Sequence, residues 1–299
     1  MKDRSQLYRY AWFSIGAAVL TMALKAGAYL ITDSVGLLSD ALETGVNLAA
    51  AVLGLTALKV AARPPDEEHA FGHGKAEYFS SGAEGSLIII AAAAIAVVSV
   101  QRLLDPRPIQ RLDVGLAIML AALVINLIVA QVLLRAGRGH HSIALEAGAQ
   151  HLMTDVWTTV GVIAGVGAVS LTGWQVLDPI IALVVGAHVA WVGARLVRQS
   201  TSGLMDAAIP EADVQAITGI LEKYAHEGVK YHALRTRQAG ARSFISVHVQ
   251  VPGKWTVQQG HDLLEEIEHE IRWVLTSATV FTHIEPVEDP LSWRDEYLR

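Results

Sequence analysis

Long apolar runs alternate with short polar segments through the first two thirds of the chain. A helix needs about 20 mostly apolar residues to cross a bilayer. Six stretches meet this requirement, at residues 9–31, 35–60, 78–104, 112–135, 143–171 and 175–198. Segments with Pro, Gly and charged residues separate them. The pattern therefore predicts six transmembrane helices.

A different pattern begins near residue 209, where charged residues become dense and the apolar periods become shorter. The periodicity predicts a helix, two strands joined at Ala-Gly-Ala, a second helix opened by Thr256, and a third strand. These elements are expected at 211–225, 229–238, 242–251, 256–275 and 278–286. Their αββαβ order fits a small α+β ferredoxin-like domain. We therefore expect a six-helix transmembrane domain at 1–208, a soluble domain at 209–290 and a tail at 291–299.

Composition agrees with a membrane protein. Of the 299 residues, 52% are hydrophobic and 17% are charged, whereas soluble domains carry about 25% charged residues. The absence of Cys excludes disulfides and thiolate metal sites. A net charge of −6 argues against nucleic acid as a partner. The six apolar stretches make membrane lipid the expected surroundings. The basic N-terminus leads into an apolar run without an evident cleavage site, which favours a retained first span.

The distribution of Lys and Arg predicts the orientation of the spans. If the N-terminus lies inside, the inner segments hold ten Lys and Arg, while the loops after the first and fifth spans hold none. The loop after the third span is an exception, with Arg102, Arg107 and Arg111. Since positive residues accumulate in cytoplasmic loops, both termini are expected in the cytoplasm.

Two polar pairs interrupt the second and fifth apolar runs. Glu43 and Asn47 are four residues apart, as are His151 and Asp155. This spacing places each pair on one face of its helix. A buried carboxylate is costly in a bilayer and persists when it pairs, ligates or lines a wet cavity. Opposed to each other, the two pairs would offer four oxygen and nitrogen ligands to a divalent cation.

Simpler interpretations remain open for each pair alone. Glu43 or Asn47 could hydrogen-bond a neighbouring helix, and His151 could pair with Asp155. Both pairs together favour a shared cation site. Asp40, one turn before Glu43, is expected to organise that site or to lie nearer the outer mouth. The lone polar residues Asn126 and His188 favour interhelical hydrogen bonds, and Asp33 favours a turn.

These features resemble the cation diffusion facilitator family, most closely its bacterial iron- and zinc-efflux members. The resemblance rests on the six spans, the two ligand pairs, "FGHGKAE" at 71–77, "LMDAAIP" at 204–210 and "HALRTRQAG" at 232–240. It implies a homodimeric divalent-cation/proton antiporter in the inner membrane of a bacterium, with a transport domain at 1–208 and a ferredoxin-like cytoplasmic domain at 209–290. It also implies that the transport site uses Glu43, Asn47, His151 and Asp155.

Metal identity is less determined, because the family more often has Asp or His followed by Asp where this chain has Glu43 and Asn47. His151 favours zinc, iron(II) or cobalt over magnesium and calcium, with cadmium and manganese as further candidates. Metal ligands must be deprotonated, so protons compete with metal for His151 and the carboxylates. This competition is the expected basis of antiport.

The loop before the third span contains Asp66, His69 and His73. An acidic loop with two His is more often solvated than metal-bound, but the resemblance places these three on a secondary cytoplasmic metal site. It also implies a salt bridge between Lys75 and Asp206, which could act as a hinge between the membrane and cytoplasmic parts.

Histidines lie on each predicted strand of the last domain and at the start of its second helix. The resemblance implies that they form a binuclear metal site at the dimer interface, where this chain has Glu in place of the usual Asp. The residues concerned are His232, His248, His261, His283 and Glu285. Bound metal there would report the cytosolic concentration to the spans.

The function predicted is therefore efflux of a divalent metal by proton antiport. One alternative is an intramembrane metal-dependent hydrolase using His151, Asp155 and Glu43, which the absence of an HExxH motif disfavours. Another is a membrane metal sensor, although no output module is recognisable after residue 290. We expect a transporter and not an enzyme.

Overall fold

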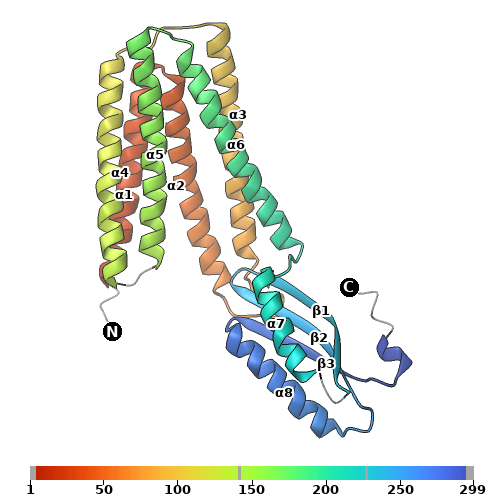
Figure 1. Ribbon diagram of the computed structural model, residues 1–299. Coiled ribbons are helices and arrows are strands. Elements are labelled where there is room, and N and C mark those ends of the chain that lie inside the picture. The colour runs from red at the N-terminus through yellow and green to blue at the C-terminus, as the bar shows by residue number, and fades with distance from the viewer. Residues whose placement is uncertain (1–4, 141–142, 226–227, 294–299) are drawn as a thin grey trace. The chain divides into compact units, whose positions relative to one another are not determined.

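Six long helices make up the first two thirds of the chain (Figure 1). The computed structural model describes residues 5–140, 143–225 and 228–293. The helices are α1 (Ser5–Thr32), α2 (Val35–Ala61), α3 (Ala76–Leu104), α4 (Leu112–His140), α5 (Ile143–Thr172) and α6 (Leu177–Leu204). Each is long and apolar enough to cross a membrane. The prediction of six transmembrane helices is confirmed.

Two of these helices continue beyond their apolar runs. The fourth run ends at residue 135, but α4 continues to His140, and α6 continues to Leu204 where its apolar run ends at 198. Hydropathy marks the part of a helix that suits lipid. The polar residues that follow contain no Pro to stop the helix, so helical hydrogen bonding extends past the apolar segment.

Tight turns connect the helices at the predicted breaks. Asp33 has a φ of 56° between α1 and α2, and Gly173 has a φ of 69° directly after α5. Arg102 Nη2 lies 2.6 Å from Asp33 Oδ2. The expectation that Asp33 is a turn residue is confirmed, and Arg102 near the end of α3 is its partner.

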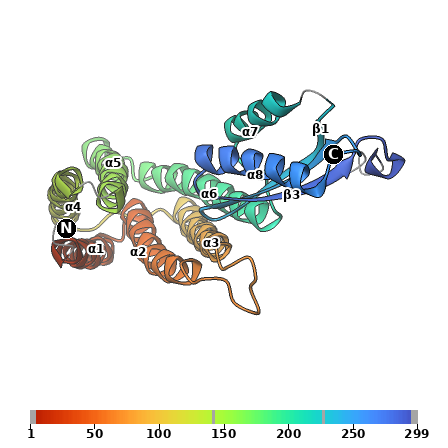
Figure 2. The same cartoon turned by 90° about the horizontal axis from the view of Figure 1, so that it is seen from below.

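The helices pack in two groups that share α2. Ala28, Leu37, Met119 and Val162 form a buried cluster joining α1, α2, α4 and α5. Ile88 and Ala92 of α3 pack against Val189 of α6, and Val35 links α2 to this pair through Ile95 and Ala182. Seen along the helices in Figure 2, α1, α4 and α5 lie close together, with α2 beside them and α3 next to α6.

The rest of the chain forms a three-stranded sheet with two helices. The elements are α7 (Glu211–Tyr224), β1 (Lys230–Ala239), β2 (Arg242–Val251), α8 (Val257–Val274) and β3 (Ala278–Pro286). Strand β2 is central, antiparallel to β1 and parallel to β3. Thr256 caps α8 through a reciprocal capping box with Gln259. The predicted αββαβ order is confirmed.

Both helices of this domain pack on the same face of the sheet. Ile217 and Leu221 of α7, Ile267 and Ile271 of α8, and Ile245, Val247 and Val249 of β2 form one buried core. Because side chains alternate along a strand, the residues between these β2 positions project from the opposite face. His248 is one of them.

The chain divides into two compact units. The membrane unit comprises residues 1–54 and 83–197, and the sheet unit comprises 55–82 and 198–299. The sheet unit therefore also contains the last residues of α2, the loop from α2 to α3, the first residues of α3 and the last residues of α6. Residues 294–299 of the predicted tail lie outside the described residues.

Candidate metal sites

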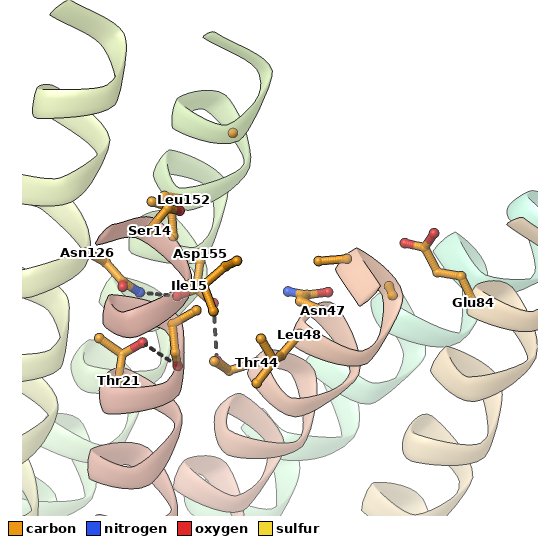
Figure 3. A pocket seen from close by; sticks show the side chains of 14 residues that line it. Ser14, Ile15, Thr21, Thr44, Asn47, Leu48, Glu84, Asn126, Leu152 and Asp155 are labelled. Carbon is orange, nitrogen blue, oxygen red and sulfur yellow. Dashed lines mark hydrogen bonds between the residues drawn. The ribbon is translucent and has the colours of Figure 1, made fainter. Parts of the chain in front are cut away.

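Asp155 of α5 is the most densely hydrogen-bonded carboxylate in the described part of the membrane unit. The Lys25 ammonium lies 3.1 and 3.0 Å from its two oxygens, and the Thr44 hydroxyl donates to it at 3.3 Å. The Asn126 amide donates to the same carboxylate from α4. Figure 3 shows Thr44, Asn126 and Asp155 pointing toward one another. Four helices therefore meet at a carboxylate that is only 5% exposed.

Asp40 of α2 belongs to the same cluster. Its carboxylate accepts from Lys25 Nζ at 3.1 Å and from the Thr159 hydroxyl at 3.1 and 3.2 Å. Thr44 lies one turn further along α2 and accepts from Lys25 Nζ at 2.9 Å. Asp40 is 1% exposed and Lys25 is fully buried. Asp40 thus lies inside the bundle, as an organiser of the site would.

Glu43 and Asn47 lie beside this cluster and make none of its hydrogen bonds given above. Both line a cavity of about 230 Å³ together with Asp155, Glu84 of α3 and His188 of α6. Asn47 also lines a second cavity, of about 410 Å³, with Thr44, Asn126 and Asp155. The predicted second-span pair therefore shares a space with Asp155, while Asp40 and Thr44 make the closer contacts.

His151 is placed by its backbone alone. It lies in α5, one turn before Asp155, and its side chain lies outside what the structure describes. The spacing that predicted a shared helix face for the two residues is retained in the continuous helix. Its membership of the cluster stays a prediction.

Sequence reasoning overlooked three residues of this region. Lys25 stands in the middle of the first apolar run, where a charge is as costly as the carboxylates that were noticed. Thr44 stands four residues after Asp40, the same spacing as in the predicted pairs. Glu84 interrupts the third run. The interhelical hydrogen bond expected of Asn126 is confirmed, and its partner is Asp155.

The loop between α2 and α3 brings Asp66, His69 and His73 together. His69 Nδ1 and His73 Nε2 lie 3.3 and 3.2 Å from the two oxygens of Asp66. The His69 backbone N–H donates to Asp66 at 2.7 Å and lowers the pKa of that carboxyl below its usual value. One ligand atom from each residue could reach a common metal ion. Asp66 and His69 are exposed, however, so the solvated interpretation stays open.

Lys75 and Asp206 form an ion pair, as the resemblance implied. Lys75 Nζ lies 2.9 Å from Asp206 Oδ1, and Arg237 Nη1 lies 3.1 Å from the same oxygen. The hydrogen bond from Lys75, followed by that from Arg237, holds the pKa of Asp206 below its usual value. This pair ties the start of α3 to the segment after α6 and to β1.

Three histidines form a row across the sheet, on the face opposite to the helices. His232 pairs with His248 between β1 and β2, and His248 pairs with His283 between β2 and β3. A bulge follows His232, where Ala233 has a φ of 51°. Glu285 lies 2.8 Å from His232 Nε2, 3.2 Å from His248 Nδ1 and 3.7 Å from His283 Nε2.

This arrangement suits a metal ion, because imidazole nitrogens and a carboxylate converge on one place. His232, His248 and Glu285 each offer a ligand atom within 4.8 Å of the others. His261 is exposed at the start of α8 and belongs to neither group of candidate ligands found among the described residues. Helix α8 covers the other face of the sheet, which separates His261 from the histidine row.

Comparison with known proteins identifies the family of the chain. Residues 11–205 match the cation efflux transmembrane domain, and residues 209–287 match the cytoplasmic domain of cation efflux proteins. The chain belongs to the cation diffusion facilitator family. It is a multi-pass membrane transporter of divalent metal ions that assembles as a homodimer, and not an enzyme. This removes the hydrolase alternative.

Two similar transporters cover almost the entire chain, and a solved domain covers part of it. The uncharacterized transporter sll1263 of Synechocystis sp. is 56% identical over 290 residues, covering 96% of this chain and 94% of that protein. The cation-efflux pump FieF of Salmonella arizonae is 30% identical over 277 residues, covering 91% of each chain. The metal-bound C-terminal domain of the CzcD transporter from Thermotoga maritima is 25% identical, with a TM-score of 0.25, and covers 27% of this chain and 99% of that domain.

Proposed function

We propose that this protein exports a divalent metal ion from the cytoplasm across the bacterial inner membrane in exchange for protons, with both termini in the cytoplasm. One observation carries the proposal. Carboxylates from α2 and α5, Asp40 and Asp155, converge in the interior of the bundle. Buried charges in a membrane protein mark ion pathways. The similarity to a cation-efflux pump supports the direction of transport.

The transport site that we propose is centred on Asp155. Asp40, Asp155 and His151 supply its strong ligands, and the Thr44 hydroxyl supplies a weak one. Glu43 and Asn47 line the cavity that leads to Asp155, and in this proposal they receive the metal on its way. The earlier prediction that Glu43 and Asn47 are themselves ligands remains the alternative.

The metal is proposed to be zinc or iron(II). Two carboxylates and an imidazole form a set of hard and intermediate ligands that suits zinc, iron(II), cobalt and manganese. Calcium prefers six to eight oxygen ligands, more than this narrow cluster offers. An imidazole favours the transition metals over magnesium.

Proton exchange follows from the same ligands. A carboxylate or imidazole that binds metal has to lose its proton, so each metal that leaves can be replaced by protons. A site that opens alternately to the two sides would carry metal out and protons in. We therefore expect a gradient of protons directed into the cell to drive efflux.

The histidine row of the sheet unit is proposed to sense cytoplasmic metal. Metal bound by His232, His248 and Glu285 would favour one packing of the homodimer and would thereby change the rate of the membrane unit. Their convergence supports this role. The loop group of Asp66, His69 and His73 is a weaker candidate because it is mostly exposed.

A flux assay tests the proposed function. Full-length protein in proteoliposomes is given Zn²⁺, Fe²⁺, Co²⁺, Cd²⁺, Mn²⁺ or Mg²⁺ with and without an imposed pH gradient. We expect Zn²⁺ or Fe²⁺ to be transported fastest, and the rate to rise when protons flow in the opposite direction. Asp155→Asn is the matched inactive control. Metal uptake that does not respond to the pH gradient would contradict antiport.

A further inference from the structure

A lysine occupies the centre of the proposed transport site. Lys25 Nζ contacts Asp40 at 3.1 Å, Asp155 at 3.0 Å and Thr44 at 2.9 Å. Its side chain is fully buried, and so is that of Asp40. The ammonium thus joins α1 to α2 and α5 at the point where their polar side chains meet.

The ammonium and a metal ion would need the same oxygen atoms. Lys25 Nζ donates to both oxygens of Asp155 and to one oxygen of Asp40. A zinc ion binds carboxylate oxygen at about 2.0–2.2 Å, so a metal between these carboxylates would lie too close to the ammonium. Two cations in contact within a dry site also repel each other strongly.

The charges lead to the same conclusion. Two carboxylates and one ammonium carry a net charge of −1, which a divalent ion would change to +1 if the ammonium stayed. With the ammonium moved away, the divalent ion and the two carboxylates are neutral. The neutral arrangement with the metal alone therefore carries no buried excess charge, whereas joint occupancy has an excess charge and also two cations in contact.

We propose that Lys25 is a tethered cation that holds the position between Asp40 and Asp155 in the metal-free state, and that the transported metal binds by displacing its ammonium. This inference rests on the proposed function. Space for the exchange lies next to the cluster, in the cavity of about 410 Å³ lined by Thr21, Thr44, Asn126 and Asp155. The lysine then weakens metal binding and favours release of the metal.

The competition lowers the apparent affinity for every metal. An ion that binds carboxylates weakly needs a higher concentration to displace the ammonium than Zn²⁺, which offsets its removal through short bonds to oxygen and nitrogen. Because the ammonium competes in the same way with each ion, removal of Lys25 should raise the affinity for every divalent ion by a similar factor. A lysine that served only to stabilise the bundle would not raise these affinities when removed.

The first test measures Zn²⁺ and Mg²⁺ binding to the purified full-length dimer by calorimetry. Wild type, Lys25→Met and Lys25→Arg are compared, and the titration of Asp155→Asn is subtracted to remove binding to the sheet unit. We expect Lys25→Met to bind Zn²⁺ at least about 10-fold more tightly, which corresponds to about 1.4 kcal/mol. Lys25→Arg should stay near wild type. Lys59→Met, at an exposed lysine of α2, should leave the affinity unchanged.

A second measurement needs no variant. In a structure of the wild-type protein with Zn²⁺ bound, Lys25 Nζ should lie beyond hydrogen-bonding distance of Asp155. Zinc at Asp155 with the ammonium still in contact would overturn the inference, as would unchanged or weaker Zn²⁺ affinity in a folded Lys25→Met dimer. The proposed function fails separately, if wild-type proteoliposomes take up no divalent metal.

Discussion

At the scale of single residues, the environment of each carboxylate distinguishes its proposed role. Asp40 and Asp155 are buried and share the ammonium of Lys25. Glu43 lies in the wall of a cavity and has an oxygen, Oε2, that is buried without a hydrogen-bond partner among the described residues. The first two residues are therefore the candidates for ligands, and Glu43 is a candidate for the approach to them.

Isosteric amide variants separate these two roles. We expect Asp40→Asn to lower the rate of Zn²⁺ transport by at least about 100-fold. Removing a residue that only supports a ligand already lowers metal affinity or activity by about 10–100-fold, and in this proposal Asp40 is itself a ligand. Glu43→Gln should lower it by less than about 10-fold. Initial uptake into proteoliposomes measures both. If Glu43→Gln lowered the rate more than Asp40→Asn did, Glu43 would be the ligand and Asp40 would not.

The ion pair of Lys75 with Asp206 leads to a pH-dependent stability prediction. The pKa of Asp206 is lowered in the folded protein, so the pair stabilises the fold above the usual pKa of Asp and loses this effect as pH falls through the lowered value. Since Asp206 is about half exposed, solvent limits the contribution to about 0.2–1 kcal/mol.

Lys75→Met should therefore destabilise the sheet unit slightly at pH 7, with no difference from wild type at a pH below the lowered pKa of Asp206. Urea unfolding of the full chain, followed by fluorescence at both pH values, measures this. Lys254→Met, at an exposed lysine of the same unit, is the control. An equal loss of stability at both pH values would show that the aliphatic part of Lys75 stabilises the unit and that its charge does not.

At the scale of elements, α6 anchors the beginning of α2. The Asp178 carboxylate accepts from the Ser34 hydroxyl at 2.6 Å and from the backbone N–H groups of Val35 and Gly36 at 2.8 and 3.0 Å. The first N–H groups of a helix have no partner within it, and here a buried side chain from a distant helix supplies one. This contact positions the α2 residues of the cluster.

Asp178→Ala should destabilise the membrane unit by about 1–3 kcal/mol, because two backbone N–H groups and the Ser34 hydroxyl proton lose their buried acceptor. Thermal unfolding of the detergent-solubilised protein measures the loss. Asp113→Ala is the matched control, since Asp113 also lies in the first turn of a helix but is exposed. Equal melting temperatures for the two variants would contradict an anchoring role.

Pairing in the sheet explains how residues distant in the sequence form one candidate metal site. His232, His248 and His283 lie on three strands, and the register aligns them side by side. Alternation along β3 then places Glu285 on the same face as His283. His261 belongs to a helix on the other face of the sheet. Among the described residues it is not one of the ligands that converge with His232, His248 and Glu285.

At the scale of the molecule, the protein combines a membrane unit that contains the proposed transport site with a sheet unit that contains candidate metal ligands of its own. Energetic coupling between two such sites is reciprocal when both influence the same equilibrium. Metal in the sheet unit would then alter transport without any contact with the transported ion.

His232→Ala tests this coupling in the full-length dimer. We expect its maximal Zn²⁺ flux to stay within about 2-fold of wild type, while the concentration that gives half-maximal flux rises about 5-fold or more, within the usual range of allosteric coupling. The control is His269→Ala, an exposed histidine on α8. If His232→Ala and wild type show the same dependence on Zn²⁺ concentration, the sheet unit does not regulate transport.

The sequence by itself determined the elements of this protein. Apolar runs of sufficient length predict spanning helices because a bilayer leaves few other structures for them, and strand alternation with its turn residues predicts the ferredoxin-like domain. Local spacing also identified Asp155 and the histidines of the strands. These features depend on residues close together in the chain.

Only the tertiary structure decided which polar residues meet. Lys25 lies 15 residues from Asp40 and 130 from Asp155, and no local pattern reveals that one ammonium joins both. The choice between Asp40 and Glu43, three residues apart on α2, depends on the rotation of that helix against α1 and α5. Helix rotation is set by the packing of side chains such as Ala28, Leu37 and Val162, and this long-range packing determines which charge becomes the neighbour of another.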